Sequence, residues 1–385
     1  IYQCDWSSDV CSSDLAQALA EKALALAPDH PAALVALADA AVRRRRWAEA
    51  EQAARRVLDL SGAQTFTRAI ASALLGEARH GQGRFADAFA AWTEAKALFD
   101  HECGDRWREA AALRLAALDR WIAALERRPE VAPGPPPRSP AFLMGFLRSG
   151  TTLAGQLIAG CQGVTVLDER PTLVHAAALL HRPDAPAEVA ALDAVALEDL
   201  RLTYWRAADS FGALPGDLLV DKMPLHAIHL PVIARLFPGA RVVIIRRDPR
   251  DVVLSCLRRM FRPNADTAQF RSPEGVVSLY ERIMRLTDLC ETRLGLNVLS
   301  LRYEDLVADP EGESRRLGGF LGLDWSPAML DVAGRPQGAD VQTPSAVQLR
   351  AGLFDGSGQW RPYADALAPV LPRLKPWIER FGYPA

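Results

Sequence analysis

The chain has 385 residues, of which 49% are hydrophobic, and this length and composition favour two packed domains. Its formal net charge of −2 argues against a protein whose main task is non-specific binding of nucleic acid. The sequence contains no run of eighteen apolar residues, so it predicts no membrane-spanning helix.

The first fifteen residues do not fit the pattern that follows them. The chain begins at Ile1 rather than at Met, and residues 1–15 match neither a signal peptide nor a helix. They resemble translated sequencing-adapter sequence, and we expect them to lie outside the natural fold. The four cysteines after residue 15 are widely spaced without a Cys-x-x-Cys pair, which predicts reduced thiols in a cytoplasmic protein and no metal site. These are Cys103, Cys161, Cys256 and Cys290.

From residue 16 to residue 128 the sequence is rich in Ala, Leu, Arg and Glu and has helical periodicity. Two similar segments begin at Trp47 and Phe85, and each has Ala three residues after the aromatic residue. They are 38 residues apart, near the period of about 34 that is typical of tetratricopeptide repeats. This part of the chain therefore resembles a tetratricopeptide-type helical repeat domain. A generic helical bundle is the alternative.

A proline-rich segment follows these helices. Residues 127–140 contain six prolines and Gly134. Proline at this density cannot continue a helix, because its ring clashes with the preceding turn and it has no N–H to donate. We therefore predict a semi-rigid linker at 129–140, with the boundary between two domains there.

After the linker, from 141 to 385, short apolar strands alternate with helices. Strands are predicted at 141–144, 218–220, 241–245 and 297–301, and helices at 192–211, 252–261 and 276–294. This order predicts an α/β domain with a parallel sheet covered on both faces. Ligands of such sheets bind at the carboxyl ends of the strands. The polar residues that follow the predicted strand ends are Arg148, Lys222, Arg247 and Tyr303.

The segment from Gly145 to Thr152 joins the first of these strands to a predicted helix. Its spacing, G-x-x-x-x-G followed by Thr-Thr, is that of a P-loop-like turn. Backbone N–H groups and a helix N-terminus at such a turn bind phosphate or sulfate. However, Thr151 stands at the position of the P-loop lysine, and Arg148 supplies the charge instead. The loop is therefore predicted to bind an anion other than a nucleotide γ-phosphate.

A basic cluster follows the strand at 241–245. Arg247 lies at the strand end, and Ser255 and Arg259 are four residues apart on the helix that follows. These three side chains can converge on a second anionic group. The alternative is a surface network of salt bridges among Arg246, Asp248, Arg250 and Asp251.

The two motifs together resemble those of the sulfotransferase family, above all the bacterial tetratricopeptide-repeat sulfotransferases and the tyrosylprotein sulfotransferases. The resemblance covers residues 140–385 and implies a sulfotransferase-type fold. It also implies 3′-phosphoadenosine 5′-phosphosulfate as the sulfate donor and no metal ion. By the same resemblance, the 3′-phosphate is held by Arg247 and Ser255, with Arg259 as a helper. The 5′-phosphosulfate is held by Arg148, Ser149, Gly150, Thr151 and Thr152, with Leu153 beside them.

The resemblance implies catalytic residues as well. Glu169, counted from Arg148, matches the general base of the tyrosylprotein sulfotransferases, and Lys222 matches a strand-end lysine that stabilises the leaving phosphate with Arg148. Tyr303 matches a turn that contacts the cofactor. Residues 343–350 and 357–363 resemble a segment that closes over the nucleotide. Competing bases are Asp168 and, ranked lower, His175, His226 and His229.

We therefore expect an enzyme that transfers a sulfuryl group to an acceptor hydroxyl on a protein, a peptide or a small molecule. The helical repeats are expected to bind a protein partner or to drive self-association. One alternative is a P-loop kinase, because residues 218–221 can pass for a magnesium-site strand. The other is a non-enzymatic scaffold in which the repeats bind a partner.

Overall fold

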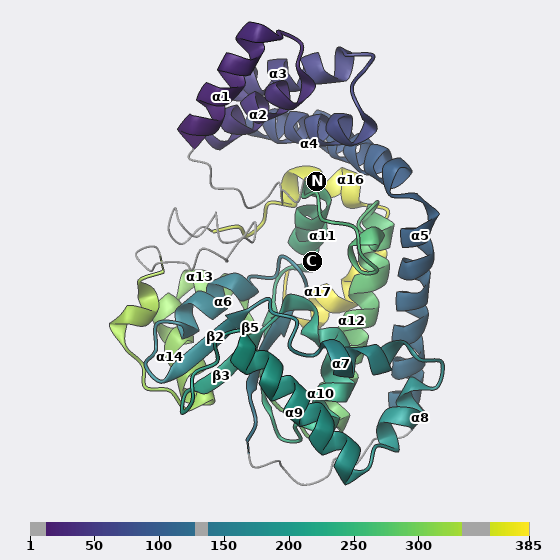
Figure 1. Ribbon diagram of the computed structural model, residues 1–385, viewed down its shortest axis with the longest axis vertical. Coiled ribbons are helices and arrows are strands. Elements are labelled where there is room, and N and C mark those ends of the chain that lie inside the picture. Colours follow the sequence, from purple (N-terminus) through teal and green to yellow (C-terminus); the bar gives the residue numbers. More distant parts are fainter. Residues whose placement is uncertain (1–12, 128–137, 333–354, 385) are drawn as a thin grey trace. The chain divides into compact units, whose positions relative to one another are not determined.

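The computed structural model describes residues 13–127, 138–332 and 355–384 of the chain, shown in Figure 1. The chain divides into two compact units, each built from separate segments. The first comprises the chain up to residue 112 together with 253–279 and 358–376, and the second comprises 113–252, 280–357 and the chain from 377. Most of the predicted linker at 129–140 lies outside the described residues, so the linker and the domain boundary stay predictions.

The first unit is helical, as the sequence predicts for the N-terminal region, and Figure 1 labels its opening helices. Helix α2 begins at a proline, whose missing N–H costs nothing at that position. The backbone of α5 breaks at Gly104, which has a φ of 68°. The helices of this unit are α1 (Ser13–Leu26), α2 (Pro31–Arg43), α3 (Trp47–Asp59), α4 (Thr65–Gly81), the first part of α5 (Phe85–Arg127), the end of α11 (Pro249–Arg258), η3 (Thr267–Gln269), the start of α12 (Pro273–Arg293), η5 (Arg361–Tyr363), α16 (Ala364–Leu367) and the start of α17 (Leu371–Arg380).

Small residues allow the helices of the first unit to approach closely. Helix α2 packs against both α3 and α4, and Ala38, Ala54 and Ala78 are fully buried in these contacts. At Gly76 a Cβ atom would lie 2.3 Å from the ring of Trp92. A side chain there would force the two helices apart. Whether these helices are tetratricopeptide repeats stays a prediction.

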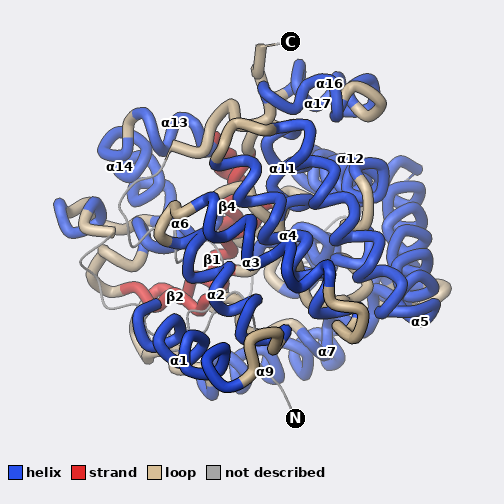
Figure 2. The backbone as a smooth tube through the Cα atoms, turned by 90° about the horizontal axis from the view of Figure 1, so that it is seen from above, coloured by secondary structure: helices blue, strands red, loops and turns tan. Residues whose placement is uncertain are grey.

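The second unit contains a five-stranded parallel sheet, drawn red in Figure 2. Its spatial order is β2-β3-β1-β4-β5. Four of the strands were predicted from their apolar runs, and β2 was missed because it lies at an edge, is half-buried and ends in Asp168. The strands are β1 (Ala141–Gly145), β2 (Val164–Asp168), β3 (Leu218–Lys222), β4 (Arg241–Arg246) and β5 (Asn297–Arg302).

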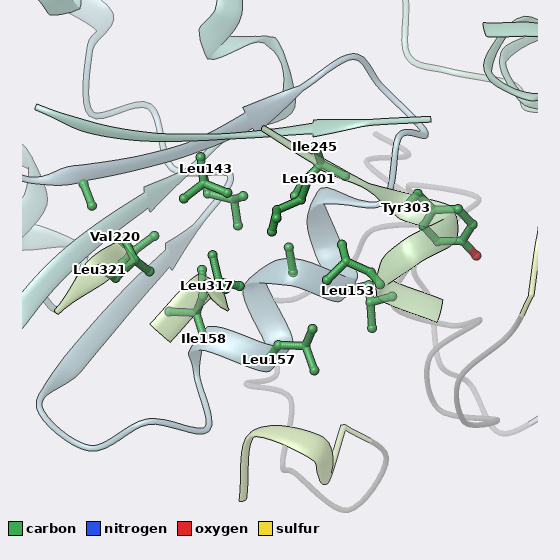
Figure 3. Close-up of a cluster of buried hydrophobic side chains, with 14 of the residues drawn as sticks. Leu143, Leu153, Leu157, Ile158, Val220, Ile245, Leu301, Tyr303, Leu317 and Leu321 are labelled. Atoms are coloured by element: carbon green, nitrogen blue, oxygen red, sulfur yellow. The ribbon is translucent and has the colours of Figure 1, made fainter. Parts of the chain in front are cut away.

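Helices cover this sheet, and one face packs on a hydrophobic cluster drawn in Figure 3. In it, Leu143 of β1 and Leu301 of β5 meet Leu157 and Leu317 from two covering helices. No described helix of the chain is long and apolar enough to cross a membrane. The second unit holds α6 (Thr151–Ile158), α7 (Val174–Ala177), η1 (Ala178–His181), α8 (Ala185–Ala190), α9 (Ala194–Ser210), η2 (Pro224–His229), α10 (Leu230–Leu236), α13 (Tyr303–Ala308), α14 (Pro310–Leu321) and η4 (Pro327–Leu330), besides parts of α5, α11, α12 and α17.

The strand order fixes where a ligand can bind. From β1 the chain continues through α6 to β2 at one edge of the sheet, whereas from β4 it continues through α11 and α12 to β5 at the other edge. Because β1 and β4 are neighbours, their connections leave in opposite directions, and ligands of parallel sheets bind at the carboxyl ends of such a strand pair. We call this place, at the carboxyl ends of β1 and β4, the crevice. The loops after β1 and β4, which carry Arg148 and Arg247, border this crevice.

Candidate active site

The loop between β1 and α6 is a compact turn with two residues in the left-handed region. Arg148 has a φ of 69° and Gly150 a φ of 105°. There is no room for a side chain at Gly145, where a Cβ atom would lie 2.5 Å from the carbonyl oxygen of Ile245. Gly150 is the N-cap of α6 and has no side chain to occupy the first N–H groups of the helix. The turn therefore presents backbone donors to the crevice.

Buried polar atoms of this turn and of the loop after β4 fit an anion. The hydroxyl of Ser149 is buried and has no hydrogen-bond partner among the residues that the structure describes. The same holds for Nε of Arg247. A buried donor without an acceptor is costly, and oxygens of a phosphate or sulfate group would satisfy donors of this kind. The turn thus suits the 5′-phosphosulfate that the resemblance implies.

A lysine reaches the turn from another strand. Lys222, at the end of β3, is only 1% exposed, and its Nζ lies 3.4 Å from Oγ1 of Thr152, the second residue of α6. Besides Arg148, a second positive charge therefore lies beside the start of α6. An ammonium group in this place can neutralise an anion bound at the N-terminus of α6.

Two carboxylates share this ammonium group. Nζ of Lys222 donates to Oδ1 of Asp168 at 2.5 Å and to Oε1 of Glu169 at 2.8 Å. They meet because β2 pairs with β3 so that Asp168 lies opposite Lys222. The structure thus brings together Glu169 and Lys222, both predicted, and adds Asp168 as a second partner of the lysine. Sequence alone could not show this, because it depends on which strand lies beside β3.

The two carboxylates differ in access to solvent. The Glu169 side chain is 34% exposed and that of Asp168 is 17% exposed. Glu169 has a φ of 53°, a conformation that costs a non-glycine residue on the order of 1 kcal/mol and is common at active sites. Its backbone N–H donates to the carbonyl of Lys222 at 2.7 Å, which holds this conformation. Of the two, Glu169 is the better placed to meet an acceptor.

Arg247 joins the loop after β4 to the turn after β1. Its Nη1 donates to the carbonyl of Arg148 at 2.9 Å and its Nη2 to the carbonyl of Gly356 at 2.6 Å. The guanidinium lies 4.9 Å from the centre of the Tyr303 ring. The Tyr303 hydroxyl in turn accepts from the N–H of Gly356 at 3.2 Å. Arg247 and Tyr303, both predicted from the sequence, therefore meet at the turn between β1 and α6.

Tyr303 also fixes the shape of that turn. A Cβ atom at Gly150 would lie 2.5 Å from Cδ2 of the Tyr303 ring. Burial raises the pKa of the Tyr303 hydroxyl despite the nearby Arg247, so the group stays neutral at physiological pH. Tyr303 thus contributes packing and a neutral hydroxyl to the site.

The remaining predicted residues lie elsewhere. The Leu153 side chain is buried in the hydrophobic cluster of Figure 3, so it supports α6 rather than facing the crevice. Ser255 lies on α11 and Arg259 directly follows that helix, and both belong to the first unit. Their contribution to a 3′-phosphate site stays a prediction. Residues 343–350, predicted to close over the nucleotide, lie outside the described residues.

The salt-bridge alternative for the basic cluster holds in part. Arg250 pairs with Asp248 through two short contacts, 2.9 Å from Nε and 2.8 Å from Nη2, and both side chains are buried. Arg246 pairs instead with Glu291 at 2.6 Å. Arg247 binds backbone carbonyls at the crevice, as described above, and so it is set apart from these pairs.

His226 and His229 are buried or partly buried and contact each other, which fits a structural role. Nδ1 of His226 and Nδ1 of His229 are 3.3 Å apart. Burial, together with His226, lowers the pKa of His229 well below its ordinary value, so His229 is neutral. His175 is exposed. The described residues include no cluster of three or more groups that could hold a metal ion. The described thiols, those of Cys161, Cys256 and Cys290, are buried and form no disulfide bond among the described residues.

Comparison with known proteins extends this description. Residues 140–327 match the family model described as "Sulfotransferase family". An uncharacterized protein of Aquifex aeolicus (strain VF5) is 24% identical over 83% of this chain and 43% of its own length. The omega-hydroxy-beta-dihydromenaquinone-9 sulfotransferase Stf3 of Mycobacterium tuberculosis is 30% identical over 37% of this chain and 39% of its own length. A putative protein-tyrosine sulfotransferase of Caenorhabditis elegans is 30% identical over 34% of this chain and 51% of its own length.

The chain thus spans less than half the length of the first of these relatives. Among solved structures, the sulfotransferase domain of the Synechococcus PCC 7002 olefin synthase has a TM-score of 0.41 and 23% identity, and covers 61% of this chain and 91% of that domain. Sulfotransferase STF9 of Mycobacterium avium has a TM-score of 0.40 and 14% identity, and covers 87% of this chain and 96% of its own. The match to the family model spans residues 140–327, and this part of the chain is therefore similar to proteins of the sulfotransferase family.

Proposed function

We propose that this protein transfers a sulfuryl group from 3′-phosphoadenosine 5′-phosphosulfate to the hydroxyl group of an acceptor. The observation that carries the proposal is the position of Lys222. Its ammonium group lies 3.4 Å from Oγ1 of Thr152 in the anion-binding turn and 2.8 Å from Oε1 of Glu169. The proposed anion site, a cation and a carboxylate thus come together, and these are the groups that sulfuryl transfer to a hydroxyl needs.

In this proposal the donor's 5′-phosphosulfate is held by the turn from Arg148 to Thr152. The Ser149 hydroxyl and the N–H groups at the start of α6 bind its oxygens, and Arg148 and Lys222 balance its charge. Arg247, with Ser255 and Arg259, takes the 3′-phosphate. The proposal requires no metal ion, because the protein's own cations stabilise the leaving phosphate.

Glu169 is proposed as the general base. A carboxylate that is one-third exposed can reach the hydroxyl of an acceptor from solvent, and it can take up the proton as the oxygen attacks sulfur. Such a base contributes about 10²–10⁴-fold to the rate. Lys222 donates to the same carboxylate and so orients it. Asp168, also bound to Lys222, holds the lysine in place.

A P-loop kinase fits the site less well. Its magnesium ion would need the acidic residue at the end of β3, which is Asp221. Asp221 is fully buried, and its carboxylate already accepts hydrogen bonds from Thr172 and Tyr204 and contacts His226. A carboxylate bound in this way is poorly placed to bind a metal ion. Thr151 at the lysine position weakens the kinase hypothesis further.

The acceptor is proposed at the level of its reacting group, a hydroxyl on a protein, a peptide or a small molecule. The relatives named above act, by their names, on a menaquinone derivative in one case and on protein tyrosine in another. The helical first unit is a candidate surface for a protein partner or for self-association. The buried thiols of the described residues, which form no disulfide bond there, favour a cytoplasmic location.

Calorimetric titration with adenosine 3′,5′-bisphosphate in the presence of EDTA tests the proposal. We expect binding without magnesium, and transfer of labelled sulfate to a component of a fractionated lysate. A kinase would instead bind ATP in a magnesium-dependent way, and a scaffold would bind neither nucleotide. Failure to bind the bisphosphate would contradict the proposed function.

A further inference from the structure

A buried carboxylate precedes Lys222 on strand β3. Asp221, the residue before Lys222 on β3, is 0% exposed. Its Oδ2 accepts from the hydroxyl of Thr172 at 2.5 Å and from that of Tyr204 at 3.0 Å, and its Oδ1 lies 3.1 Å from Nε2 of His226. A buried carboxylate is tolerated when donors surround it in this way. Three separate segments, the loop after β2, α9 and η2, are thereby joined to β3.

The three contacts are not equivalent. Tyr204 lies on α9 and His226 on η2, and each joins a helix to the strand. Thr172 instead lies three residues after Glu169, on the segment that carries the proposed base. Only the Thr172 contact therefore couples the buried carboxylate to Glu169.

The segment from Glu169 to Thr172 is fixed to β3 at both of its ends. At its start, the N–H of Glu169 donates to the carbonyl of Lys222 at 2.7 Å. At its end, the hydroxyl of Thr172 donates to Asp221, and the N–H of Thr172 donates to the carbonyl of Arg170 at 2.9 Å. Between these anchors Glu169 is held at a φ of 53°. A backbone conformation of this kind persists only where neighbouring contacts impose it.

We infer that Thr172 and Asp221 are positioning residues that hold Glu169 against Lys222. Neither side chain faces the crevice, and both act through the backbone of the segment between the two anchors. The inference rests on the proposed function, in which Glu169 is the base. A base must lie within hydrogen-bond reach of its proton, and a displacement of about 1 Å can cost on the order of a hundredfold in rate. Loss of the Thr172 anchor should therefore lower kcat and leave donor binding intact.

The test compares Thr172→Val with Tyr204→Phe in the full chain. Each variant removes one buried hydroxyl that donates to the same oxygen of Asp221, so both should lower the melting temperature to a similar extent. Thr172→Val should reduce kcat by about tenfold or more, with the Kd for adenosine 3′,5′-bisphosphate unchanged within about twofold. Tyr204→Phe should keep kcat within about twofold of the parent. Thr172→Ser, which restores the hydroxyl, should recover most of the lost kcat.

Hydrogen exchange at the Glu169 amide gives a second readout that does not depend on turnover. We expect faster exchange in Thr172→Val than in Tyr204→Phe, because only the first variant frees the segment that carries this amide. Equal exchange in both variants, or equal losses of kcat, would overturn the inference. A parent protein that binds no bisphosphate and transfers no sulfate would contradict the proposed function instead, and the exchange comparison would still decide the positioning role.

Discussion

Glu169 is the side chain on which the proposed chemistry depends most directly. Glu169→Gln keeps the size of the side chain and its capacity to accept from Lys222 but removes the base. We expect bisphosphate binding to stay within about twofold of the parent and kcat to fall by about 10²–10⁴-fold. Steady-state kinetics with a radiolabelled donor measure the loss.

Two further variants test whether the loss of turnover is specific to Glu169. Glu188→Gln alters a carboxylate that pairs with Arg182 at the surface, and it should leave turnover unchanged. Asp168→Asn alters the second partner of Lys222 and should reduce kcat less than Glu169→Gln does. If Asp168→Asn is instead the more damaging change, the base is Asp168 and the roles of the two carboxylates are exchanged.

Arg247 has two tasks that a binding experiment can separate. It donates to the carbonyl of Arg148 in the turn between β1 and α6, and it is proposed to hold the 3′-phosphate. Arg247→Ala should therefore weaken the binding of adenosine 5′-monophosphate to some degree and the binding of adenosine 3′,5′-bisphosphate more strongly. The additional loss should correspond to about 1.5–3 kcal/mol for the charged contact. Calorimetry on both ligands gives the difference.

An equal loss of affinity for both ligands would mean that Arg247 only supports the turn. Arg315→Ala is a suitable control, because Arg315 pairs with Glu311 at the surface of α14 and should leave both affinities unchanged.

At the scale of single residues, the sequence predicted the members of the site better than their contacts. Arg148, Lys222 and Arg247 lie at or just after the ends of strands that were predicted from apolar runs, whereas Glu169 follows β2, which was missed, and was implied only by the resemblance. The bridge from Lys222 to Asp168 depends on the pairing of β2 with β3. The contacts of Arg247 with backbone carbonyls depend on how two loops meet. Neither leaves a local signal in the sequence.

The turn before α6 illustrates how an element depends on one glycine. Gly150 has a φ of 105°, and a Cβ atom there would lie 2.5 Å from the Tyr303 ring. Gly163 also has a positive φ, of 70°, but nothing lies within 4 Å of its Cβ position. Gly163→Ala should therefore cost about 1–2 kcal/mol of stability for the backbone alone.

Gly150→Ala should cost more than Gly163→Ala, because the buried Tyr303 ring must also move. It should weaken binding of adenosine 3′,5′-bisphosphate by at least about tenfold, whereas Gly163→Ala should leave binding unchanged. Urea denaturation and calorimetry on both variants make the comparison. Equal effects of the two substitutions would mean that Tyr303 does not shape the turn.

The elements themselves were predictable where the hydrophobic signal was continuous. The strands β1, β3, β4 and β5 coincide with apolar runs, and the helices at 192–211 and 276–294 match α9 and α12 to within a few residues. Strand β2 has no such run, because Thr165 and Asp168 interrupt it at a half-buried edge. Helix α11 begins at Pro249, earlier than predicted, since a proline is favourable in the first turn of a helix.

At the scale of the whole molecule, the helical unit is assembled from three segments of the chain. Residues 253–279 and 358–376 join the N-terminal helices, and buried contacts within the unit hold them there. Arg258 pairs with Glu77 at 2.8 Å, and Nδ1 of His80 lies 2.7 Å from the hydroxyl of Tyr363. Composition and periodicity describe only segments that are continuous in sequence, so neither could show that separate segments join one unit.

Lys96 should make the stability of this unit depend on pH in the alkaline range. The side chain is buried, and its Nζ donates to the backbone carbonyls of Cys256 and Arg259 and lies 5.7 Å from the Phe261 ring. Burial lowers the pKa of Lys96 from 10.5 to about 8. Between these two values the unfolded chain retains a proton that the folded chain has lost. The contribution of Lys96 to the free energy of unfolding therefore rises with pH through this window, by a total on the order of 3 kcal/mol.

Lys96→Met should abolish that rise. The quantity to compare is the difference in the free energy of unfolding between parent and variant, because tyrosines also titrate near pH 10 and affect both proteins alike. Urea denaturation of the full chain at several pH values from 7 to 10, followed by the helical signal, measures it. Lys22→Met, at an exposed position of α1, is the matched control and should follow the parent curve. If the parent and Lys96→Met differ by the same amount at every pH, Lys96 titrates in the folded protein as it does in the unfolded chain, and burial does not lower its pKa.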